Sequence, residues 1–226
     1  MPFVGSSDLV IAFGSQFSDT QTLGWSLVPD PALTVIIGKN AIDGVQVDVK
    51  GVLEKVLEVV DASRISQSVT GSLGNFRAIK APLVGRDEKI DQGTLYLRLN
   101  DSGFLQPEDV IILANATPIL GGRDLILPPK SRTIVSGMWF SIGHMLPAAQ
   151  GAALAQQRRG RTILFEGDGS FQISVQEIST IIRERLDMTI FLTNNDGYAY
   201  EGHIHGMHET YNDIARWRYL RLPEDL

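Results

Sequence analysis

The sequence predicts an α/β protein built around a parallel sheet, and three observations carry this prediction. Short apolar runs ending in Gly, Ser or Asn alternate with segments whose apolar residues recur at helical spacing. Residues 161–197 read as strand, helix and strand, the βαβ unit that joins parallel strands. Both of these strands end in a polar turn containing glycine. Because ligands of open α/β sheets bind at the carboxyl ends of the strands, we expect the functional site there.

The first part of the chain is predicted as β-β-α, with strands within 8–15 and 32–40 and a helix over 47–64. Two strands and one helix make a small core, so this part looks incomplete. Residues 65–95 show little periodicity and several turn formers. We therefore predict two domains, 1–75 and 105–226, joined by a linker over 76–104.

The second part supplies the βαβ unit. We expect a strand within 106–117, a loop over 121–136, and an Ala-rich helix over 141–157 with Pro147 in its first turn or at a kink. A strand over 161–170 then leads to a helix over 174–186, for which Ser174 and Glu177 form a capping box. The last predicted strand covers 188–197.

Composition excludes several classes of function. The 226 residues are 43% apolar and 20% charged, as in an ordinary soluble globular protein. The net charge of −6 argues against broad affinity for nucleic acid, and we interpret the short basic cluster at 156–161 as a solvated helix end. Cysteine is absent, which excludes disulfides, thiolate metal sites and cysteine nucleophiles. The first residues make a poor signal peptide and no apolar run approaches the roughly 20 residues that span a bilayer, so we expect a cytoplasmic protein with no membrane partner.

The two polar turns together predict a site for a phosphorylated ligand and a magnesium ion. Gly167 and Gly169 permit close approach of a ligand, and Ser170 lies near a helix N-terminus that favours an anion. Asp168, the amide of Asn195 and the carbonyl of Gly197 offer oxygen ligands, which together with phosphate oxygens and water suit Mg²⁺. Each turn alone is typical of an ordinary turn.

The two turns and the number of residues between them resemble a known cofactor-binding motif. Gly167-Asp168-Gly169 is followed, after residues 170–193, by Asn194-Asn195, which resembles the thiamine diphosphate motif. The segments "GDGSFQISVQEIST" and "NNDGYAYEGHIHG" look like the pyruvate decarboxylase and indolepyruvate decarboxylase family, and "WFSIG" at 139–143 resembles its W-G-S-I-G. Residues 105–121 resemble the strand and turn that open the family's diphosphate-binding domain, and residues 1–75 resemble the end of its middle domain.

The resemblance implies a three-layer α/β/α thiamine diphosphate-binding fold, truncated at both ends, with Mg²⁺ as the second cofactor. It implies magnesium ligands at Asp168, Asn195 and Gly197, and a catalytic acid at Glu201 that faces the substrate. Ile142 would prop the cofactor into its bent shape, and the carbonyl of Phe140, at a position where the family has Gly, would accept a hydrogen bond from its amino group. The full set of implied cofactor contacts is Asn115, Thr117, Phe140, Ser141, Ile142, Gly167, Asp168, Gly169, Ser170, Asn195, Gly197, Tyr198 and Tyr200.

The implied reaction is the decarboxylation of a pyruvate-like 2-keto acid to an aldehyde and CO₂, which makes the protein a carboxy-lyase. A different thiamine diphosphate enzyme, such as a relative of acetohydroxyacid synthase or benzoylformate decarboxylase, stays open, as does a non-catalytic chain that binds the cofactor. Nothing in 1–106 resembles the family's pyrimidine-binding domain. We therefore expect a partial chain that is not active alone and belongs to a homodimer or tetramer. A zinc site at His203, His205 and His208 is a weaker alternative.

Overall fold

The computed structural model describes residues 7–15, 17–18, 22, 25–61, 63, 80–137, 139–157 and 159–225. The chain divides into two compact units, residues 1–74 and 75–226. Among the described residues, no helix combines the length and the apolar character needed to cross a bilayer.

The first unit is a small four-stranded sheet with one helix. Strands β1 and β2 pair in parallel, and β3 and β4 extend the sheet as an antiparallel pair. Its helix buries no residue, and Ile37 is the only buried apolar side chain among the described residues of this unit. The two predicted strands and the predicted helix are present, but the predicted β-β-α order misses the two-residue strands β3 and β4, which are too short to give an apolar run. The elements are β1 Val10–Phe13, η1 Pro31–Leu33, β2 Thr34–Ile37, β3 Ala41–Ile42, β4 Val45–Gln46 and α2 Val49–Val59.

The second unit is an α/β/α sandwich, as the sequence predicts. Its sheet has the order β6-β5-β7-β8 and every pair is parallel. The elements are α3 Gln92–Ser102, β5 Val110–Leu113, α4 Thr117–Gly122, β6 Arg132–Val135, α5 Met145–Gln156, β7 Thr162–Gly167, α6 Asp168–Ile173, α7 Glu177–Arg183, β8 Met188–Thr193, α8 Ala199–His205, η5 Thr210–Asn212, η6 Tyr219–Arg221 and α9 Leu222–Asp225.

The side chains of the two central strands, β5 and β7, point alternately to the two faces of the sheet, and they form one hydrophobic core on each face. Ile112 and Leu164 point toward α5, α6 and α7, whereas Ile111, Ile163 and Phe165 point toward α3 and the segment around Leu125. All four residues of β5 and most of β7 are fully buried, as expected for strands covered by helices on both faces.

Part of the range predicted as a linker is a packed helix. Helix α3 lies within 76–104, and its Tyr96 is 1% exposed and packs on Phe165. Asp91 caps it by accepting hydrogen bonds from the backbone and the hydroxyl of Thr94. The prediction of a linker is therefore wrong for 92–102. The segment is mostly polar and buries only a few side chains, so its apolar face gave no clear helical pattern. Residues 76–79 lie outside the described residues.

Two other local predictions are wrong. The loop expected over 121–136 contains the edge strand β6, whose four residues are all exposed and therefore give no apolar signal. The strand expected over 161–170 ends at Gly167, because Asp168–Ile173 form helix α6, and the helix expected over 174–186 is present as the shorter α7. Ser174 lies between them and its buried hydroxyl has no hydrogen-bond partner, so it does not form the predicted capping box.

Candidate functional site

The two predicted turns meet at the carboxyl edge of the sheet. Strands β7 and β8 run in parallel register, which places Gly167 beside Thr193 and brings the segments that follow them together. The Asp168 carboxylate accepts hydrogen bonds from the backbone N–H groups of Asn195, at 3.1 Å, and Asp196, at 2.8 Å. The turn that contains Asp168 therefore organises the turn that contains Asn195.

Three polar groups meet between these turns: the Asp168 carboxylate, the Asn195 side-chain amide and the Gly197 carbonyl. One end of the Asn195 amide lies 3.0 Å from Asp168 Oδ1 and 3.0 Å from the Gly197 carbonyl oxygen. With its NH₂ at this end, the amide donates to both oxygens, which satisfies all three groups when no metal is bound. A bound cation would instead favour the orientation with the amide oxygen at this end, and three oxygens would then face it. Octahedral Mg²⁺ binds oxygens at about 2.1 Å, which separates neighbouring ligands by about 3 Å, so these residues fit a magnesium ion.

Asp168 is 2% exposed, and burial raises the pKa of its carboxyl above the ordinary value. The backbone N–H groups of Gly169, Asp196 and Asn195 oppose this shift. A cation would favour the charged form of the carboxylate. Among the described residues, no group of three or more His, Cys, Asp or Glu side chains could hold a metal ion, so the structure does not support zinc at His203, His205 and His208.

The turn after β7 needs glycine for close packing. A Cβ added at Gly169 would lie 2.5 Å from the Tyr198 ring, so this aromatic side chain lies directly against the turn. The hydroxyl of Ser170 accepts a hydrogen bond of 2.8 Å from Gly143 N–H. Ser170 thereby ties the turn to the segment 139–143, which contains Phe140, Ser141 and Ile142.

The remaining predicted contacts lie at the same edge, in exposed or strained segments. Asn115 follows β5, and its buried side-chain oxygen has no hydrogen-bond partner. Ala116 has the sparsely populated backbone angles φ 57° and ψ −112°, and Thr117 begins α4, with its carbonyl accepting from Gln92. Ile142 is 40% exposed.

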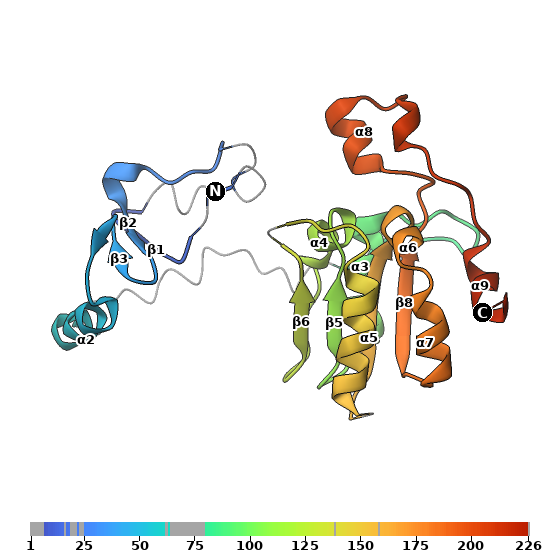
Figure 1. The fold of residues 1–226 in the computed structure, drawn as a ribbon, viewed down its shortest axis with the longest axis horizontal. Coiled ribbons are helices and arrows are strands. Elements are labelled where there is room, and N and C mark those ends of the chain that lie inside the picture. Colours follow the sequence, from blue (N-terminus) through green and yellow to red (C-terminus); the bar gives the residue numbers. More distant parts are fainter. Residues whose placement is uncertain are drawn as a thin grey trace. The chain divides into compact units, whose positions relative to one another are not determined.

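Helix α8 lies beyond the carboxyl ends of the strands (Figure 1) and carries the predicted catalytic acid. Glu201 is half-exposed, and its carboxylate lies 3.6 Å from His205 Nε2, one turn further along the helix. Tyr200 contacts Phe140 with its ring. No described contact joins Glu201 to Asp168 or Asn195, so the structure leaves these two groups separate.

Glu166 belongs to this edge and was missed by the sequence analysis. It is fully buried, and burial raises the pKa of its carboxyl to about 7. The Ser170 hydroxyl and Gly167 N–H oppose the shift, yet neither is placed to form a full hydrogen bond, and both carboxyl oxygens lack a partner. The available signal was a charged residue inside an otherwise apolar strand, two positions before Asp168, the predicted metal ligand.

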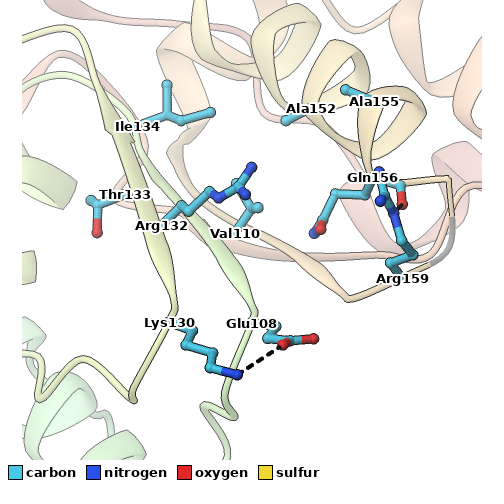
Figure 2. Close-up of a pocket in the computed structure, with 10 residues that line it drawn as sticks. All are labelled: Glu108, Val110, Lys130, Arg132, Thr133, Ile134, Ala152, Ala155, Gln156 and Arg159. Carbon is cyan, nitrogen blue, oxygen red and sulfur yellow. Dashed lines mark hydrogen bonds and ion pairs between the residues drawn. The ribbon is translucent and has the colours of Figure 1, made fainter.

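A second concave surface lies elsewhere in this unit. A groove of about 780 Å³ is lined by residues of α5, β5 and β6. Figure 2 shows Arg132 and Ile134 on the side of β6 that faces α5. An ion pair of 3.8 Å between Lys130 and Glu108 lies at one end. The groove contains none of the predicted cofactor contacts, so the candidate site stays at the carboxyl edge.

Comparison with known proteins shows what this chain is similar to. Residues 123–218 match the family model "Thiamine pyrophosphate enzyme, C-terminal TPP binding domain". The chain is 41% identical over 240 aligned positions to a pyruvate decarboxylase of Aspergillus parasiticus, an alignment that covers 98% of this chain and 41% of that protein. It is 34% identical over 232 positions to an alpha-keto-acid decarboxylase of Mycobacterium ulcerans, covering 97% of this chain and 39% of that protein. The chain thus spans about two-fifths of the length of these curated relatives.

Proposed function

Because this chain belongs to the thiamine pyrophosphate enzymes and is related along nearly its whole length to pyruvate and alpha-keto-acid decarboxylases, we propose that it serves the non-oxidative decarboxylation of a 2-keto acid to an aldehyde and CO₂. The observation that carries the proposal is the convergence of the Asp168 carboxylate, the Asn195 amide and the Gly197 carbonyl beside a glycine turn that opens a helix. Magnesium is the proposed metal, the cytoplasm the proposed location, and a dimer or tetramer the proposed assembly.

Different residues at the carboxyl edge of the sheet are proposed to contact different parts of the cofactor. Asp168, Asn195 and Gly197 would hold Mg²⁺, which neutralises the diphosphate, while Gly169 and Ser170 offer a close backbone approach and a hydroxyl. The exposed apolar side chain of Ile142 lies on the segment that Ser170 fixes, and it is proposed to support the cofactor rings.

When bound, the cofactor supplies a carbon nucleophile and an electron sink for the electron pair released with CO₂. The protein's own contribution is orientation, exclusion of water and proton transfer. We assign proton transfer to Glu201, whose half-exposed carboxylate lies on α8 above the carboxyl edge. Apolar side chains around the edge, including Ile142, Tyr200 and Ile204, would disfavour the charged carboxylate of a 2-keto acid relative to its uncharged products.

The first prediction concerns Asp168→Ala. Loss of the only carboxylate among the three converging groups should weaken thiamine diphosphate binding in the presence of Mg²⁺ by about 1000-fold. Isothermal titration calorimetry with and without EDTA measures it: chelation should weaken binding to the unaltered chain and leave the variant unchanged. Asp187→Ala, an exposed aspartate just before β8 at the opposite edge, is the matched control.

Equal affinity in Asp168→Ala and the unaltered chain would remove Asp168 from the metal site. The reaction itself is tested separately, by analysing the products from pyruvate with thiamine diphosphate and Mg²⁺. Acetaldehyde and CO₂ support the decarboxylase proposal, whereas a carbon–carbon ligation product contradicts it.

A further inference from the structure

Phe140 has a backbone conformation that is unfavourable for a bulky side chain. Its φ of 48° lies in the left-handed region, where such a conformation costs on the order of 1 kcal/mol. The backbone there is fixed by a hydrogen bond of 3.3 Å from Phe140 N–H to the Ser136 carbonyl. A strained aromatic residue beside a candidate site suggests a function for its side chain.

The Phe140 ring is in contact with helix α8. Its centroid lies 6.5 Å from that of the Tyr200 ring, with the planes tilted by 33°. This separation is within the range of favourable aromatic pairs. Tyr200 immediately precedes Glu201, so the contact lies next to the proposed acid.

Helix α8 has little other packing among the described residues. Gly202 is its only buried residue, and Ile204 is 59% exposed. The base of the helix is fixed by Tyr198, whose N–H donates to the Asn212 carbonyl at 2.9 Å. The far end is fixed through Asn212, whose side chain donates to the Gly206 carbonyl at 3.1 Å. Those bonds join α8 to its own following segment, whereas Phe140 joins it to the segment that carries Ile142.

The other end of that segment is fixed as well, because Gly143 N–H donates to Ser170. A continuous set of contacts therefore runs from the turn after β7, through the segment 139–143, to α8. We propose that Phe140 is a positioning residue, which through Tyr200 holds α8 against the cofactor-binding segment and so fixes where Glu201 presents its carboxylate. The contact stands on its own geometry, and its effect on turnover rests on the proposed function.

The contact is tested by hydrogen–deuterium exchange of the full 226-residue chain without cofactor or metal. Phe140→Ala keeps the Cβ and the backbone strain and removes only the ring. It should raise the exchange rates of the 199–205 amides about 2- to 10-fold and leave those of β5 and β7 unchanged. Phe140→Tyr should restore protection. Trp139→Ala is the control, because this neighbouring aromatic is 82% exposed and has no ring contact among the described residues.

A double-mutant cycle tests whether the Phe140 and Tyr200 rings stabilise α8 through their contact with each other. Tyr200→Ala should raise exchange as Phe140→Ala does, and the double variant should add little to either. Unchanged exchange in Phe140→Ala, or effects that add in the double variant, would overturn the proposal.

The positioning role is read from turnover of a 2-keto acid by the cofactor-loaded protein. Phe140→Ala should lower kcat several-fold with little change in thiamine diphosphate affinity, and it should have no further effect once Glu201→Gln is present. An equal loss in the Glu201→Gln background contradicts action through Glu201. Because the 226-residue chain is expected to be inactive alone, absence of turnover in the unaltered chain does not contradict the proposed function, and the exchange result then decides the contact. A carbon–carbon ligation product in place of an aldehyde and CO₂ contradicts the proposed function and leaves the contact standing.

Discussion

At the amino edge of the parallel sheet, where β5 and β7 begin, the buried carboxylate is paired with an opposite charge, whereas at the carboxyl edge two side chains have buried oxygens without a partner. Asp109 is 2% exposed and receives two hydrogen bonds from Arg161, at 3.1 and 2.6 Å. Arg161 also donates to the Phe104 carbonyl, and its guanidinium lies 4.8 Å from the centre of the Phe104 ring. At the other edge, Asn115 and Glu166 have buried oxygens without hydrogen bonds.

This difference separates stability from function within one sheet. A paired, hydrogen-bonded charge is tolerated in a protein interior, whereas an unpaired acceptor costs free energy. The hydroxyl of Thr162 at the amino edge also has no hydrogen-bond partner, but leaving a neutral hydroxyl unpaired costs less free energy than leaving a carboxylate unpaired. We infer that the amino edge stabilises the fold and that the carboxyl edge gives up stability where the ligand binds.

Arg161→Met tests the amino edge and should have the largest effect on stability. It would leave the buried Asp109 carboxylate without an opposite charge, holding only the hydrogen bond of 2.7 Å from the Gln106 N–H, which should lower the free energy of unfolding by about 4 kcal/mol. Urea denaturation measures this change. Arg159→Met is the control, because Arg159 is exposed and its side chain bonds only the Gln156 carbonyl among the described residues. Equal losses of unfolding free energy in Arg161→Met and Arg159→Met would show that the ion pair of Arg161 with Asp109 does not stabilise the fold.

Glu166→Gln tests the carboxyl edge and should act in the opposite direction. The folded-state pKa of about 7 lies above the ordinary 4.5, so the folded protein holds this proton more tightly than the unfolded chain. Above pH 7 the carboxyl is charged in both states, and its burial costs roughly 3 kcal/mol at about 1.4 kcal/mol per pKa unit. That cost falls as the pH drops from 7 toward 4.5.

The Gln variant should therefore be more stable than the unaltered chain by roughly 3 kcal/mol at pH 8, and the advantage should vanish near pH 4.5. Urea denaturation across this pH range, with EDTA present and no cofactor, measures it. Glu184→Gln is the control, since Glu184 is exposed on the surface. A difference that does not vary with pH would show that the Glu166 carboxyl is not the group that titrates.

The architecture could be predicted from the sequence because it depends on patterns within short segments. Apolar runs identified β5, β7 and β8, and the two glycine turns identified the carboxyl edge. The edge strand β6 and helix α3 were missed, because an exposed strand has no apolar run and α3 buries few of its side chains.

The site was predictable in part. The meeting of Asp168 with Asn195 follows from the parallel register of β7 and β8 and is confirmed by the structure, whereas their metal ligation stays a prediction. The Arg161 pair was not predicted: we expected a solvated basic cluster, but its partner Asp109 lies far away in the sequence. The contact of Phe140 with Tyr200 and the burial of Glu166 also depend on tertiary packing, which no local pattern encodes.

Ser170→Ala should have the smallest effect on stability and is the finest test of the carboxyl edge. Removing the hydroxyl leaves the buried Gly143 N–H without its acceptor, which should lower the free energy of unfolding by about 1 kcal/mol in the absence of cofactor. Ser179→Ala, which removes an exposed hydroxyl bonded to the Gln176 carbonyl, should change it by less. Ser170→Ala should also raise amide exchange across 139–143, because the Ser170 hydroxyl joins that segment to the turn after β7. If exchange rises there while the strands stay protected, the carboxyl edge is held by single weak bonds that a ligand can reinforce. If the strands lose protection too, Ser170 supports the sheet itself, and the separation of a stabilising edge from a binding edge does not hold.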